Sequence, residues 1–162
     1  MNAARISLLL PAALVLGFLA SPAAADGPVK EYLKGLNTVK LTISISQELV
    51  DAGMPGAKLR TQTELALRRA GMKVDKNETG SAMQLDITGC KGPGTNVFAC
   101  CVHISVNDTV KVARNGKDII TQVWGPDLYV LYLPNGVADD LMNTTQARID
   151  LFLNDWLQAN PR

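Results

Sequence analysis

The residues most capable of chemistry lie close together between positions 90 and 103. Cys90, Cys100 and Cys101 flank one short loop, and the single histidine of the chain, His103, follows two residues later. Thiols and an imidazole are ligands for metal ions such as zinc and copper. The same thiols form disulfides in an exported protein. This group therefore predicts either a disulfide-closed loop or a metal site, and the surrounding elements bear on the choice.

The N-terminal residues predict export. One base, Arg5, precedes an apolar stretch over Ile6–Ala20, and the small residues Ala23–Ala25 follow it. This order is typical of a secretory signal peptide, so we predict that residues 1–25 are a signal peptide removed after Ala25. The apolar stretch is shorter than the ~20 residues that a bilayer requires, so we expect no transmembrane span after processing. The alanine-rich composition favours a bacterial protein that is periplasmic or secreted.

Charge and motif content exclude several classes of function. The 162 residues include 16 Lys and Arg against 15 Asp and Glu, and Arg5 lies in the predicted signal peptide. The remaining chain is neutral and lacks the cationic excess that supplies most non-specific affinity for nucleic acid. It has no nucleotide-binding, hydrolase or cofactor motif of useful specificity. We therefore expect a non-catalytic protein with no cofactor and no nucleic-acid partner.

Hydrophobic periodicity predicts a lead-in over residues 26–38 and one α+β domain over residues 39–162. Apolar side chains alternate with polar ones where strands are expected, and recur every three or four residues where helices are expected. Gly71 is placed to end the first long helix, and Gly125-Pro126 should disturb the last strand. The expected elements are a helical turn at 29–36, strands at 39–45, 83–87, 98–112 and 118–132, and helices at 55–70 and 137–159.

The order β-α-β-β-β-α predicts one four-stranded mixed sheet with two helices packed on one face. The other face should then be polar and open to a partner. We expect an envelope protein or a lipid-like ligand to bind this face or an exposed edge strand. The residues of the predicted partner-binding face are Lys40, Thr42, Ser44, Gln84, Asp86 and Thr88.

Strand register favours one of the possible cysteine pairs. A Cys90–Cys101 disulfide would set Ile87 opposite Ile104, so that the apolar side chains of both strands share a face. A Cys90–Cys100 disulfide would place Ile87 opposite a polar residue instead. We predict the Cys90–Cys101 bond with Cys100 buried as a free thiol, while Cys90–Cys100 and a vicinal Cys100–Cys101 bond remain alternatives.

The alternative function is that of a periplasmic protein that binds a metal or a small ligand. Cys90, Cys101 and His103 would be the metal ligands, although their spacing matches no common zinc or copper motif. A second possibility is a pocket lined by aromatic side chains, but packing in the core and along a strand edge is the favoured interpretation of these residues. They are Trp124, Tyr129, Tyr132 and Trp156.

The element order, the predicted signal peptide and the helix end at Leu65–Gly71 resemble small bacterial envelope domains of the lipopolysaccharide-assembly lipoprotein E type. The resemblance covers residues 39–158 and implies a similar α+β fold and a role in the cell envelope. The lipidated cysteine of that family has no counterpart here, since no cysteine follows the apolar stretch. No functional residue is carried over.

Overall fold

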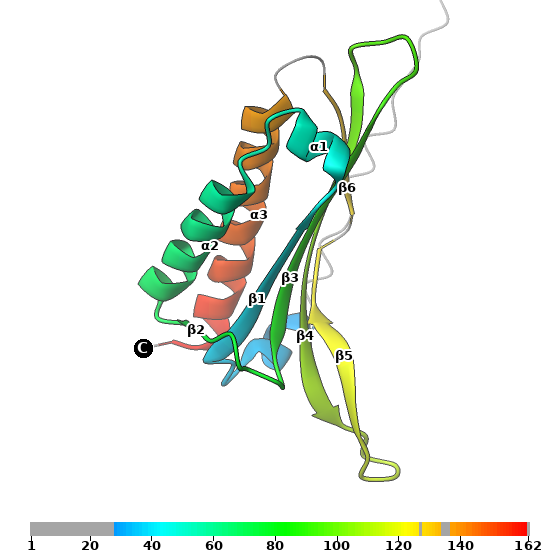
Figure 1. Ribbon diagram of the computed structural model, residues 1–162. Coiled ribbons are helices and arrows are strands. Elements are labelled where there is room, and N and C mark those ends of the chain that lie inside the picture. Colours follow the sequence, from blue (N-terminus) through cyan, green and yellow to red (C-terminus); the bar gives the residue numbers. More distant parts are fainter. Residues whose placement is uncertain (1–27, 127, 134–136, 162) are drawn as a thin grey trace, which may run out of the picture.

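The protein is an α+β domain in which one twisted sheet carries its long helices on a single face (Figure 1). The computed structural model describes residues 28–126, 128–133 and 137–161. The predicted signal peptide and its cleavage site lie outside these residues. The helical turn expected in the lead-in is a 3₁₀-helix, η1 (Pro28–Leu33).

The chain forms its helices and strands in an order close to the predicted one. The strands are β1 (Thr38–Ile45), β2 (Lys73–Val74), β3 (Ala82–Lys91), β4 (Phe98–Lys111), β5 (Asp118–Trp124) and β6 (Tyr129–Leu133). The α-helices are α1 (Gln47–Asp51), α2 (Gly56–Ala70) and α3 (Val137–Ala159). Within the sheet the strand order is β2-β1-β3-β4-β5, and β6 also pairs with β4.

The first half of the domain is the predicted βαβ unit. β1 and β3 are parallel neighbours, with Ile43 opposite Leu85, and α2 connects them across one face of the sheet. α2 ends where Gly71 adopts a φ of 99°, and the amides of Gly71 and Met72 donate to the carbonyls of Arg68 and Leu67. Glycine adopts this left-handed conformation without strain because it has no Cβ.

The sheet has six strands, so the prediction of four was wrong. Lys73–Val74 forms a short parallel pair with the start of β1, which hydrophobic alternation over two residues could not reveal. The expected last strand is divided at Gly125-Pro126 into β5 and β6, which lie end to end along the same edge of β4. Proline has no N–H to donate to the ladder, so pairing stops there and resumes after the interruption.

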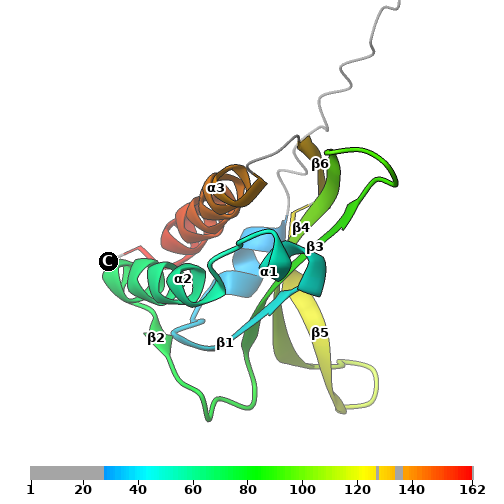
Figure 2. The ribbon, with the colours of Figure 1, turned by 45° about the horizontal axis from the view of Figure 1, so that its top comes forward.

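The core lies between the sheet and the two long helices. α2 and α3 run side by side over one face, as predicted (Figure 2). Their inward residues Leu67, Ile149 and Phe152 are fully buried together with the apolar face of β3 and β4. The other face of the sheet, which we call the outer face, points away from these helices.

A third helix, α1, was not predicted, and it covers one end of β3. Its residue Leu49 is fully buried against Gly89, where an added Cβ would lie 2.8 Å from Leu49 Cδ2 and 3.1 Å from Cys100 Sγ. The Gly89 amide donates to Ser46 Oγ at 3.1 Å. The glycine thus allows the short helix to pack directly on the strand.

The β3–β4 register differs from the predicted one by two residues. Ile87 lies opposite Val102, and Cys90 lies opposite Ala99. A shift of two residues leaves every side chain on its predicted face, so hydrophobic alternation could not distinguish the two registers. The turn decides the register instead, because Pro93-Gly94 forms the centre of a tight turn in which Gly94 has a φ of 67° and the Thr95 amide donates to the Gly92 carbonyl.

Candidate interaction surface

The polar residues predicted from alternation do share the outer face. Register places Thr42 beside Gln84 and Ser44 beside Asp86, so the residues of β1 and β3 form two adjacent rows. Asp86 is half-buried, and the other five side chains are exposed. Gln84 accepts a hydrogen bond from Asn107 of β4 at 3.0 Å. The structure brings the predicted face together, while its role in binding stays a prediction.

The three cysteines are free in the structure. Cys90 and Cys101 both lie on the outer face, but Cys101 is opposite Thr88, so the two cysteines are offset diagonally rather than paired. Cα atoms in diagonal positions are typically about 7–8 Å apart, beyond the usual disulfide range. The register that favoured the Cys90–Cys101 bond is therefore wrong, and the bond itself remains a prediction for peptide mapping of the exported protein.

Cys100 is buried on the helix side of β4, as predicted. Burial raises the pKa of its thiol, and the neighbouring thiols of Cys90 and Cys101 raise it further. A thiolate at this position would lose its hydration without gaining a positive partner. Cys100 therefore acts as a small apolar residue of the core and not as a nucleophile.

We expect Cys100 to make the protein less stable at alkaline pH. Because the pKa of the folded thiol is raised, the unfolded chain loses this proton first, and the contribution to folding is lost as pH rises through the folded pKa. The free energy of unfolding should fall less steeply with alkaline pH in Cys100→Ala than in wild type. Leu65→Ala, at an exposed site on α2 with no ionisable group, is the control and should keep the wild-type slope. Equal slopes in the wild type and both variants would contradict the expectation.

The proposed metal ligands do not form a site. His103 lies opposite Asp86, and Cys101 is two residues away on the same face, whereas Cys90 is further along the ladder. Within residues 28–126, 128–133 and 137–161, no three His, Cys, Asp or Glu side chains lie close enough to hold a metal ion. The alternative of a metal-binding protein therefore has no support from this geometry.

The four aromatic residues do not line a common pocket either. Trp124 and Trp156 are buried, and the indole of Trp124 donates to Asp155 Oδ2 at 3.0 Å. Tyr129 and Tyr132 instead lie on opposite faces of β6, because Tyr129 is paired with Val102 and Tyr132 with Ala99. Packing in the core and along an edge, the favoured interpretation, is what the structure shows.

The strand β6 is an apolar edge, which sequence reasoning named neither as a separate strand nor as a candidate site. Its sequence, Tyr-Val-Leu-Tyr-Leu, contains no charged residue. Val130 is 50% exposed and Tyr132 is 75% exposed, both on the outer face. On the helix side the guanidinium of Arg148 lies 4.6 Å from the ring centre of Tyr129. The absence of charge from five consecutive residues was the signal available in the sequence.

The other edges of the sheet are protected, which makes β6 stand out. At the far edge β2 is two residues long, and Arg60 Nη1 donates to the Leu41 carbonyl of β1 at 3.4 Å. β5 carries Asp118, which lies 3.6 Å from Lys111 Nζ, and its pairing with β4 is irregular near Asn107. Short strands, charges and bulges are the usual protections of an exposed edge, and β6 has no charge or bulge of this kind.

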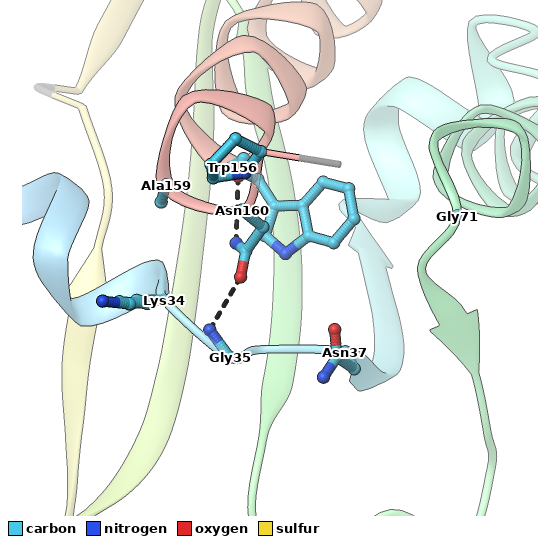
Figure 3. Close-up of a pocket in the computed structure, with 8 residues that line it drawn as sticks. Lys34, Gly35, Asn37, Gly71, Trp156, Ala159 and Asn160 are labelled. Atoms are coloured by element: carbon cyan, nitrogen blue, oxygen red, sulfur yellow. Dashed lines mark hydrogen bonds between the residues drawn. The ribbon is translucent and has the colours of Figure 1, made fainter.

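An open depression of about 560 Å³ lies at the C-terminal end of α3 (Figure 3). Two of its side chains, Asn160 and Trp156, hold segments of the chain together. The Asn160 side chain accepts from the Gly35 amide at 2.7 Å and donates to the carbonyls of Leu33 and Trp156, both at 2.9 Å. The Trp156 indole donates to the Leu36 carbonyl. These contacts join α3 to η1 and to the segment before β1, so Asn160 and the Trp156 indole have a structural role here.

No protein-family model and no curated protein matches the sequence significantly. Among solved structures, PelC from Paraburkholderia phytofirmans, described as a dodecamer, matches with a TM-score of 0.40 and 13% identity over 75% of this chain and 86% of that chain. A minor lipoprotein from Acinetobacter baumannii matches with a TM-score of 0.33 and 12% identity over 75% of this chain and 87% of the other. Similarity at this level does not extend to function. It does not assign the chain to the lipopolysaccharide-assembly family.

Proposed function

We propose that the protein is an exported, non-catalytic binding or assembly factor that engages another polypeptide through the edge strand β6. The observation that carries this proposal is the edge of Tyr129–Leu133, which contains no charged residue and, among the described strands, pairs only with β4. An added strand would satisfy the outward N–H and C=O groups of β6, and alternate side chains would pack against the partner.

A polypeptide suits this edge better than a lipid. The open groups of a strand edge are regularly spaced donors and acceptors, which an extended backbone complements and an acyl chain does not. On the outer face Val130 pairs with Cys101 of β4, which pairs with Thr88 of β3, so the exposed hydroxyl of Thr88 lies in the same row two strands away and suits the polar rim of a protein interface. The partner is therefore a protein of the same compartment.

The described part of the chain favours binding over catalysis. The single histidine lies within a strand, and its Nδ1 atom is buried without a hydrogen-bond partner. A general base must reach the proton that it abstracts, and the buried Nδ1 does not, so that Nε2 alone is left for such a role. None of the described helices has the length and apolar composition needed to cross a membrane. We propose a periplasmic or secreted location, which rests on the predicted signal peptide.

Site-specific photo-crosslinking in bacterial cells tests the proposal. A photoreactive residue at Tyr132 should give a defined adduct, whereas the same residue at Arg69, exposed on α2, should give none. The partner is then identified by mass spectrometry and purified. Tyr132→Lys should weaken its binding by about tenfold or more, equivalent to about 1.4 kcal/mol, because the charge must be desolvated at the new strand pair.

The matched control is Ile120→Lys on β5, which is 70% exposed and should leave the affinity unchanged. An adduct from Arg69 as strong as that from Tyr132, or full affinity in Tyr132→Lys, would contradict the proposal.

A further inference from the structure

The strand β6 is complementary to itself. If two copies pair in antiparallel orientation around Leu131, Val130 of each copy lies opposite Tyr132 of the other, and Tyr129 lies opposite Leu133. Pairs of an aromatic and a β-branched side chain are among the favourable cross-strand pairs of antiparallel sheets. The side chains of β6 are thus well matched to those of a second, antiparallel copy of the same strand.

This register also keeps the faces of the sheet in agreement. Val130 and Tyr132 lie on the outer face in each copy, while Tyr129, Leu131 and Leu133 lie on the helix side. A two-fold axis at Leu131 makes each of these contacts twice. Tyr132, 75% exposed in the single chain, would then be covered by the second copy.

Charge does not oppose this association. β6 contains no charged residue, so its pairing with itself brings no like charges opposite each other. The formal net charge of the chain is +1, so repulsion between two whole copies is also small. Proteins near zero net charge associate more readily than strongly charged ones.

We propose that the protein forms a two-fold dimer in which β6 pairs antiparallel with β6 of a second copy around Leu131. The two sheets then become one continuous sheet with the long helices of both copies on the same side. This inference rests on the proposed use of β6 as a binding edge and names a second copy as the occupant. Because the strand is five residues long, the interface is at the small end of specific interfaces, and the dimer should form reversibly with concentration.

Sedimentation velocity of the purified protein over about 1–300 µM, the range expected for a weak interface, tests the proposal. The average mass should rise from that of one chain toward that of two. Val130→Lys with Tyr132→Lys places introduced lysines opposite each other in both cross-strand pairs, so this variant should stay monomeric. Val130→Lys with Tyr132→Glu makes both pairs oppositely charged and should recover the dimer.

The matched control is Ile120→Lys with Gln122→Lys, which makes the same change on two exposed positions of β5. It should dimerise like wild type, and circular dichroism should show that all variants are folded. A wild-type protein that stays monomeric throughout, or a double-lysine variant of β6 that dimerises normally, would overturn the proposal. If Tyr132 crosslinks specifically to a different protein while the purified chain is monomeric, the proposed function stands and the second-copy inference fails.

Discussion

Replacing Phe152 with alanine should lower the free energy of unfolding by about 3–5 kcal/mol, the cost typical of a buried aromatic residue. Phe152 is fully buried, and its ring centre lies 5.0 Å from that of Trp124 with the ring planes at 67°. The substitution removes this edge-to-face contact and leaves a cavity between α3 and the sheet. Since small domains are stable by only about 5–15 kcal/mol, a large part of the stability would be lost.

Chemical denaturation followed by circular dichroism measures this effect. Leu151→Ala is the matched control, because Leu151 is the preceding residue on α3 but is 41% exposed, and it should cost less than about 1 kcal/mol. If the alanine variant does not fold, Phe152→Leu is measured in its place. This substitution keeps most of the side-chain volume and should lower the free energy of unfolding by about 1–2 kcal/mol. Similar losses for Phe152→Ala and Leu151→Ala would show that the helix does not pack as described.

Asn160→Asp should destabilise the protein by about 2–4 kcal/mol at neutral pH, although the two side chains have nearly the same shape. The amide nitrogen of Asn160 donates to the carbonyls of Leu33 and Trp156, and a carboxylate has no hydrogen to donate. Two carbonyls would lose their donor, and a negative charge would lie at the C-terminal end of α3, where the helix dipole disfavours it.

The loss should depend on pH in a defined direction. Next to two carbonyl oxygens the introduced carboxyl should have a raised pKa in the folded state, so its protonated form restores one O–H donor. The variant should therefore be closest to wild type in acid, and the difference should widen as pH rises above about 4, the ordinary value for aspartate. Denaturation of both proteins from about pH 3.5 to 7 checks this. A difference that is constant over this range would mean that the amide is not the donor in these contacts.

These two residues matter for function because α3 supports the edge that we propose as the binding site. Trp124 of β5 is held by Phe152 and by the Asp155 carboxylate, and Tyr129 of β6 lies under Arg148. Loss of α3 packing should therefore disturb both segments along β4. A stability measurement must accompany every binding experiment for this reason.

Local patterns were sufficient to predict most elements. Period-two alternation located β1 and β3, and the glycine at position 71 ended α2 because it can adopt a positive φ without strain. The closing helix begins at Val137 and ends at Ala159 as predicted. The polar face was also predictable, because alternate residues of a strand must lie on opposite sides of a sheet whatever its neighbours are.

Alternation alone determined the faces of the strands but not their register, their ends or their exposure. Cys90 and Cys101 were expected to face each other, yet the turn at Pro93-Gly94 sets a register two residues away with every face unchanged. Exposure of β6 depends on which strands pair beside it, and those strands come from distant parts of the chain. The sequence by itself therefore determined the fold class and the polar face, because these follow from local periodicity. Only the tertiary structure decided the diagonal offset of Cys90 and Cys101 and the edge position of β6, because both depend on contacts between separate elements.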